Sequence, residues 1–184
     1  MSRTLTGALL VATPVLTEPR FDRTVILLIA HEANGALGVV LNRASEVPVR
    51  GVLREWADLA SEPSTVFTGG PVAPEAALCL ALLSSGHPEG WTPIDGGLLG
   101  TVDLAGSPAR LERQVERLRV FAGYAGWGAG QLEAEVAQNA WVVVPALPDD
   151  PFSDQPSTLW RRVLRRQRGL IGAMATYPPD PSLN

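Results

Sequence analysis

The chain has 184 residues, of which 46% are hydrophobic and 18% charged, a composition typical of one globular domain with its own core. All 15 of its Lys and Arg residues are arginines, which excludes a lysine Schiff base, a Walker lysine and a Ser-Lys dyad. The formal net charge of -4 argues against a domain-wide basic surface for nucleic acid, and the single cysteine, Cys79, favours a reducing compartment.

The chain opens with an apolar stretch, GALLVATPVL at residues 7–16, that looks like a short signal peptide. Because it lacks an A-x-A-like cleavage site and Pro14 interrupts it, we predict a strand over Leu9–Ala12 instead. The next stretch, TVILLIAHEANGALGVVLN at residues 24–42, has two apolar runs around Asn34-Gly35 and predicts an antiparallel hairpin. Neither run alternates, so we expect the hairpin inside a sheet that is covered on both faces.

Helices and further strands are expected along the rest of the chain. Apolar residues recur at helical spacing in residues 47–60, 107–120, 130–139 and 157–169. The second of these segments also has Ser107 as a cap and Pro108 at the first helical position. Strands are predicted over Thr65–Thr68, Ala77–Leu83, Leu99–Val102, Val120–Tyr124 and Trp141–Val144, and loops over 87–97 and 145–156.

Strands and helices interleave without a regular βαβ order, which favours an α+β fold over a doubly wound one. We predict one compact layered domain over residues 1–176, with helices flanking a mainly antiparallel, curved and barrel-like sheet. Residues 177–184 are expected to form a loose tail. No apolar run approaches the roughly 18 residues that span a bilayer, so a soluble, cytoplasmic protein is expected.

The most motif-like stretch is GYAGWGAGQLEAE, residues 123–135. It does not match G-x-G-x-x-G, because the third glycine position falls on Gln131 or Glu133, and a Walker loop would need the absent lysine. Acidic residues at the start of the predicted helix would also repel a phosphate. We therefore predict that these glycines permit tight turns and close packing around Trp127.

Residues for catalysis or metal binding are few. His31 and His87 are the only histidines and, with Cys79, cannot alone build a tetrahedral zinc site. His31, next to Glu32 at the hairpin end, is the candidate general base; the alternative, which we favour, is a solvated or hydrogen-bonded histidine. Acids could also meet around Mg²⁺, although their spacing gives no sign of it: Asp22, Glu32, Asp95 and Asp103. No cofactor or metal is expected.

The segment WRRVLRRQR, residues 160–168, concentrates arginines in one predicted helix. These cations could contact phosphates or an acidic partner, or they could form a solvated face near the C-terminal end of the helix. We favour the solvated helix because no DNA-binding scaffold is evident, and direct DNA binding stays an alternative. The residues concerned are Arg161, Arg162, Arg165, Arg166 and Arg168.

Several stretches together resemble the YqgE/AlgH family of small bacterial proteins: LLVATPVL, RFDRTVILLIAHEANGALGVVLNR, FTGGPV, GYAGWGAGQLEAEVAQNAW, and PF before a tryptophan-bearing helix. The resemblance covers nearly the whole chain and implies a compact α+β fold in a cytoplasmic bacterial protein. Some members carry a provisional description as transcriptional regulators. Two positions depart from the family pattern: Cys79-Leu80 replaces a usual leucine-histidine pair, and Ala44 replaces a proline.

The resemblance and the polar residues together give three functional hypotheses. The first is a noncatalytic regulatory or interaction domain that binds a protein or a small anionic ligand at one polar patch. The second is a hydrolase-type enzyme that uses His31 or clustered carboxylates, and the third is DNA binding through the arginine helix. The predicted patch consists of Arg23, Asn42, Arg43, Trp127, Gln131 and Glu133.

Overall fold

The computed structural model describes residues 4–179, within which it has ten strands and four short α-helices. The strands are β1 Ala8–Ala12, β2 Val25–Glu32, β3 Gly35–Val40, β4 Ala44–Pro48, β5 Thr65–Thr68, β6 Val72–Leu83, β7 Trp91–Pro93, β8 Leu99–Val102, β9 Val115–Gly128 and β10 Trp141–Pro145. The α-helices are α1 Val49–Val52, α2 Gln131–Ala137, α3 Leu159–Arg165 and α4 Gly169–Ala173. Single 3-10 segments cover Arg54–Leu59, Pro108–Arg110, Asp150–Phe152, Pro156–Thr158 and Met174–Thr176.

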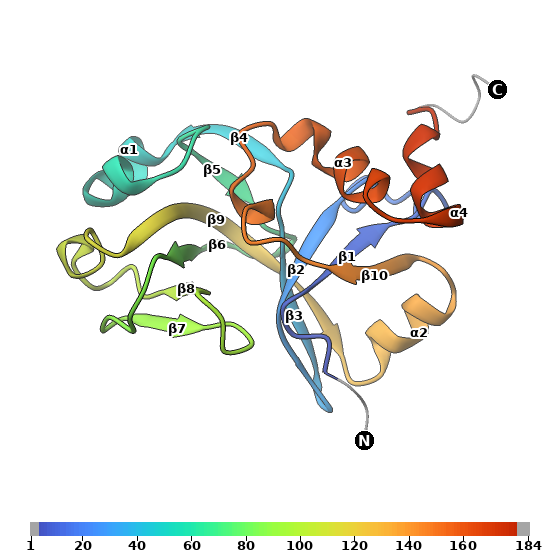
Figure 1. Ribbon diagram of the computed structural model, residues 1–184, viewed down its shortest axis with the longest axis horizontal. Helices are drawn as coiled ribbons and strands as arrows, with labels where there is room; N and C mark the ends of the chain where they lie inside the picture. Colours follow the sequence, from blue (N-terminus) through green and yellow to red (C-terminus); the bar gives the residue numbers. More distant parts are fainter. Residues whose placement is uncertain (1–3, 180–184) are drawn as a thin grey trace.

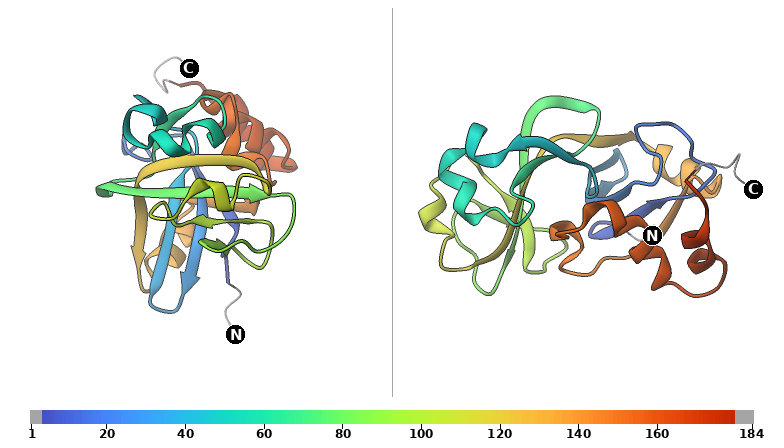
Figure 2. Two further views of the ribbon diagram at one scale, coloured as in Figure 1. Left: turned by 90° about the vertical axis from the view of Figure 1, so that its left-hand side faces the viewer. Right: turned by 90° about the horizontal axis from the view of Figure 1, so that it is seen from above.

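The strands form one mainly antiparallel sheet that curls into a half-barrel (Figure 1). Eight of them follow the order β10-β1-β2-β3-β9-β6-β8-β7. The β4–β5 pair joins this sheet where β5 runs parallel to β9. Helices lie along the outside, with α1 and α4 at opposite ends of the long axis (Figure 2). The predicted α+β fold with a curved, mainly antiparallel sheet is confirmed.

The predicted hairpin is the centre of the sheet. Strand β2 pairs with β1 on one side and β3 on the other, and β3 in turn pairs with β9. The two turn residues are Ala33 and Asn34, so that Glu32 pairs with Gly35. A Cβ atom at Gly35, whose φ is +144°, would lie 2.2 Å from the carbonyl oxygen of Trp127. Glycine is therefore required where the hairpin meets β9.

Both faces of the hairpin are covered, as its non-alternating sequence predicts. Side chains of β2 point alternately into two cores, and its first four residues are completely buried. On one face Val25 and Leu27 pack in a core that includes α3 residues Trp160, Val163 and Leu164. On the other face Ile26 and Leu28 pack in a core that includes Trp127, Leu132 and Trp141. The sheet is thus held between α3 and α2.

The helix predicted over residues 107–120 is wrong. Only Pro108–Arg110 forms a 3-10 turn, and the chain enters the 14-residue strand β9 at Val115. Antiparallel pairing of β9 with β6 continues from Val115 to Tyr124, and this ladder overrides the local helical preference. The apolar spacing is satisfied differently, because Leu111 in the turn and Leu118 in the strand enter the same core.

Other predicted segments differ in their extent. In the segment 47–60, the first two residues end β4 and the rest forms α1 and a separate 3-10 helix, since the backbone leaves the helical region at Leu53. The segments predicted as helices over 130–139 and 157–169 contain α2 and α3, and the predicted loop 87–97 contains the short strand β7. Of the predicted tail, residues 180–184 lie outside the described residues. No helix in the described part of the chain is long and apolar enough to cross a membrane.

Candidate functional site

Three of the predicted patch residues, Arg23, Asn42 and Arg43, meet at the loop between β1 and β2. The Asn42 side chain donates from Nδ2 to the carbonyl oxygen of Arg23 at 2.8 Å, and its Oδ1 accepts from the amide of Val25 at 3.0 Å. Arg43 donates from Nη2 to the carbonyl oxygen of Asp22 at 2.8 Å. These contacts fix the backbone on which Arg23 adopts a left-handed φ of +52°.

The Arg23 side chain extends over Trp160, with Cζ 4.6 Å from the centre of the ring. Its Nη2 donates to the carbonyl oxygen of Tyr177 at 2.9 Å and to that of Pro178. Arg161 donates from Nη2 to the same Tyr177 oxygen at 3.2 Å. Among residues 4–179, no carboxylate lies within ion-pair distance of either guanidinium. Two cations therefore converge on one carbonyl oxygen.

This arrangement has an electrostatic cost. Burial lowers the pKa of the Arg23 guanidinium, the charge of Arg161 lowers it further, and Asp22 opposes the shift. A cavity of about 470 Å³ lies beside the Arg23 guanidinium and Tyr177, within the size range of small-ligand pockets. We call it the Arg23 pocket; it is lined by Pro14, Val15, Thr17, Asp22, Arg23, Trp160, Tyr177, Pro178 and Pro179.

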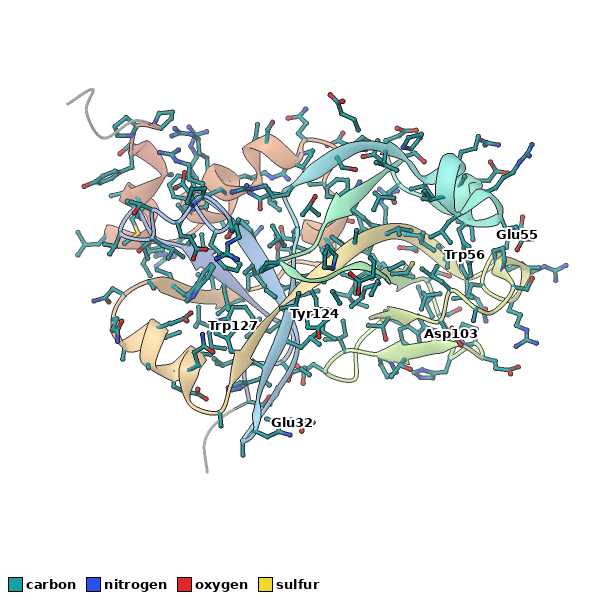
Figure 3. The ribbon with its side chains drawn as sticks, turned by 180° about the vertical axis from the view of Figure 1, so that it is seen from behind. Glu32, Glu55, Trp56, Asp103, Tyr124 and Trp127 are labelled. Atoms are coloured by element: carbon teal, nitrogen blue, oxygen red, sulfur yellow. The ribbon has the colours of Figure 1, made fainter. Side chains whose placement is uncertain are left out.

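The remaining patch residues belong to the other face of the sheet, where Trp127 of β9 (Figure 3) packs in one core with Leu132 of α2, the helix that carries Gln131 and Glu133. There Glu135 joins β9, α2 and β10: its Oε2 accepts from Nε1 of Trp127 at 2.9 Å and of Trp141 at 2.8 Å. Its Oε1 accepts from Nε2 of Gln131 at 3.0 Å. These contacts tie the glycine-rich motif to α2 and β10, and we call the group of Trp127, Gln131, Glu135 and Trp141 the lock around Glu135. The predicted single patch is divided into two groups.

Glu135 is a residue that sequence reasoning missed. A signal was present, because Gln131 and Glu135 are one helical turn apart and follow a tryptophan. What the spacing could not show is that the indoles of Trp127 and Trp141 lie edge to face, with ring centres 6.2 Å apart, around one carboxylate. That contact depends on the pairing of distant strands.

His31 contacts both the N-terminal segment and α2. Its Nδ1 accepts from the amide of Leu5 at 3.0 Å, so the neutral ring carries its proton on Nε2. Nε2 lies 2.9 Å from Oε1 of Glu133 and donates to it. The His31 side chain is only 7% exposed, and both of its nitrogens are engaged. This geometry suits a structural histidine better than a general base.

The Glu133 contact gives a pH-dependent prediction. A hydrogen bond from its own backbone amide lowers the pKa of Glu133, and the bond from His31 lowers it further. The contact should therefore stabilise the fold above the usual Glu range and lose its effect as the pH falls through the lowered pKa. We expect the difference in unfolding free energy between the wild type and Glu133→Gln to shrink on titration from about pH 7 to about pH 3. Chemical denaturation at each pH measures it, and a difference that grows toward low pH would contradict the assignment.

The arginine helix is largely used within the fold. Arg166 makes a bidentate pair with Asp150, at 2.8 and 2.5 Å, and Arg162 donates to the hydroxyl of Ser153 at 2.5 Å. Arg161 does not line the Arg23 pocket but donates to the Tyr177 carbonyl oxygen beside it. The two other arginines of the segment, Arg165 and Arg168, are exposed. The five cations do not form one common surface.

A buried arginine that the sequence did not indicate lies at the middle of β9. Arg119 is 1% exposed, its Cζ is 4.0 Å from the ring centre of Phe67, and its Nε has no hydrogen-bond partner among the described residues. Burial lowers its pKa to about 10, opposed by nearby acids, which leaves it charged at neutral pH. Its two Nη atoms donate to the carbonyl oxygens of Ser61, Glu62, Pro151 and Ser153.

The acids considered for magnesium do not gather. Figure 3 places Glu32 at the tip of the hairpin and Asp103 near the far end of the molecule. In the described range, no group of three or more His, Cys, Asp or Glu side chains is arranged to hold a metal ion. The predicted patch residues therefore point to two candidate sites, the Arg23 pocket and the lock around Glu135.

Comparisons with known proteins point to one family. The family model described as AlgH-like matches residues 9–171. A UPF0301 protein of Streptomyces avermitilis is 52% identical, with 98% of this chain and 95% of the relative covered, and one of Mycobacterium tuberculosis is 47% identical, with 99% and 92% covered.

Two solved structures share the fold. A Corynebacterium diphtheriae crystal structure has a TM-score of 0.89 at 30% identity and covers 96% of this chain and 94% of its own. The solution structure of the AlgH protein from Pseudomonas aeruginosa has a TM-score of 0.69 at 26% identity and covers 98% and 100%.

Proposed function

The chain belongs to the AlgH-like family, and from that premise we propose that it is a noncatalytic interaction domain that binds an anionic group of a partner or small ligand. The binding site would be the Arg23 pocket. The observation that carries this proposal is the convergence of Arg23 and Arg161 on one carbonyl oxygen beside a cavity of about 470 Å³.

The local structure explains why an anion would bind there. Two nearby guanidinium groups repel each other, so a carboxylate or phosphate that contacts both would relieve the repulsion. It would also accept charge-assisted hydrogen bonds, which are stronger than the present bonds to the neutral carbonyls of Tyr177 and Pro178. Asn42 and Arg43 fix the loop that presents Arg23, which is the preorganisation that a binding site needs.

The alternatives have less structural support. An enzyme based on His31 would need an accessible nitrogen, whereas Nδ1 and Nε2 are engaged by Leu5 and Glu133. DNA binding through α3 would need a common basic face, whereas Arg161, Arg162 and Arg166 contact the protein itself.

A regulatory role in the bacterial cytoplasm is part of the same proposal. The described relatives are bacterial proteins, and the one cysteine, Cys79, is a buried free thiol, as suits a reducing compartment. In this proposal, regulation is exerted by the bound partner or ligand, which Arg23 and Arg161 recognise.

The proposal is tested by calorimetric titration with inorganic phosphate, with citrate, and with one short peptide that has a free C-terminal carboxylate. The same peptide with an amidated C-terminus is the comparison that lacks this charge. We expect at least one anionic probe to bind, and Arg23→Gln and Arg161→Gln each to weaken it about tenfold, which is about 1.4 kcal/mol. Arg165→Gln, an exposed arginine on the same helix, is the matched control and should leave affinity unchanged. Failure of all probes, or equal effects of the three variants, would refute the site.

A further inference from the structure

A second cavity lies where the half-barrel does not close. Strands β10 and β7 are the two ends of the strand order. The segment 146–148, which follows β10, and residues 94, 95, 97 and 98 of the β7–β8 connection line a common cavity of about 520 Å³ with Leu99 at the start of β8. We call it the mouth cavity. Because β-barrel mouths are frequent ligand sites, this opening is a candidate for a function distinct from that of the Arg23 pocket.

The floor of the mouth cavity is apolar and continuous with the main core. Leu82 and Ile94 are buried members of the core that fills the half-barrel, and Leu99 and Ala146 pack against it. On opposite sides of the opening, Leu98 is 44% and Leu147 is 51% exposed. An aliphatic group entering here would cover these leucines and gain about 25 cal/mol for each Å² of apolar surface removed from water.

The charged side chains at the rim are acidic. Asp95 and Glu116 line the cavity, and among residues 4–179 no arginine or histidine does. Within the described part of the chain, neither carboxylate accepts a hydrogen bond, in contrast to Glu135 and Asp150. The backbone of Asp95 has a φ of +52°, and a Cβ atom on the neighbouring Gly7 would lie only 3.2 Å from the Cβ of Asp95. Asp95 thus lies against Gly7 at the rim, and both Asp95 and Glu116 are exposed to solvent.

We propose that the mouth cavity binds a small amphipathic amine, whose ammonium group lies at Asp95 and Glu116 and whose aliphatic chain packs on Leu82, Ile94 and Leu99. The two carboxylates select a cation and disfavour a fatty acid, while the apolar floor selects an alkyl chain over a metal ion or polyamine. A volume of about 520 Å³ fits a small molecule of this kind.

The test is an NMR titration of the methyl-labelled protein with octylammonium, octanoate and octanol, each below its micelle concentration. We expect saturable shifts confined to the mouth-cavity methyl groups, and an octylammonium affinity at least about tenfold above that of octanoate. Asp95→Asn/Glu116→Gln should abolish this preference and leave octanol binding unchanged. The control Glu75→Gln/Glu112→Gln removes two exposed acids outside the cavity and should retain the preference.

Three results would overturn the proposal: no saturable binding of octylammonium, shifts centred elsewhere, or a preference that persists in Asp95→Asn/Glu116→Gln. Octanol binding and the methyl spectrum of that variant show whether its cavity is still folded. Arg23→Gln should not affect octylammonium binding, so this test and that of the Arg23 pocket can fail independently.

Discussion

Replacing Arg119 by alanine is expected to lower the free energy of unfolding by about 4 kcal/mol. The side chain is 1% exposed and connects β9 to two separate loops through four backbone carbonyl oxygens. Its removal leaves those oxygens without their donors and opens a cavity against Phe67. Urea denaturation measures the change.

Arg119→Lys is the informative companion variant. Lysine keeps a positive charge, but its compact ammonium group cannot reach both pairs of carbonyl oxygens as the guanidinium fork does. We expect an intermediate loss of stability. A control at an exposed position of the same strand, Arg117→Ala, should cost less than about 1 kcal/mol, because its contact with Asp149 is a long surface pair at 4.0 Å. Equal effects at Arg117 and Arg119 would show that the buried contacts do not stabilise the fold.

Replacing Glu135 by alanine is expected to lower the free energy of unfolding by about 3 kcal/mol. For a domain of this size, this corresponds to a fall of about 6–12 °C in the midpoint of thermal unfolding. The variant leaves the indole donors of two tryptophans, Trp127 and Trp141, without their acceptor where both rings are packed in the core. The near-ultraviolet circular dichroism of the folded variant should also change, because both rings lose an orienting contact.

Glu133→Ala is the matched control for Glu135, since the two glutamates are two residues apart on α2. The Glu133 side chain is half exposed and, in contrast to Glu135, contacts neither indole, so we expect a much smaller loss of stability than for Glu135→Ala and an unaltered tryptophan signal. If both variants were equally stable, the lock around Glu135 would have no energetic role, and the glycine-rich motif would need a functional explanation.

The hairpin could be predicted from the sequence because its signal is local. Residues 25–28 are apolar without alternation, and they are buried on both faces as that pattern requires. Residues 107–120 show the opposite case. Their spacing fits a helix, but Leu111 and Leu118 reach one core through a turn and a strand, and the deciding ladder comes from β6, more than thirty residues earlier.

The candidate site could be predicted only in part. The resemblance singled out Arg23, Asn42 and Arg43, which do meet. It did not show that Arg23 lies over Trp160 and shares the Tyr177 carbonyl oxygen with Arg161, because these partners lie more than a hundred residues later. The same limit explains why one patch was expected where two groups exist. Periodicity and motif spacing describe neighbours along the chain, whereas both groups are assembled by the folding of the sheet between α2 and α3.

The most direct measurement is NMR of the arginine side chains while the best-binding anionic probe is added. In our proposal the signals of Arg23 and Arg161 shift together with one saturation curve, and those of Arg165 and Arg168 do not move. Saturable binding that leaves the Arg23 and Arg161 signals in place, or a uniform drift of all arginine signals, would contradict an anion site in the Arg23 pocket.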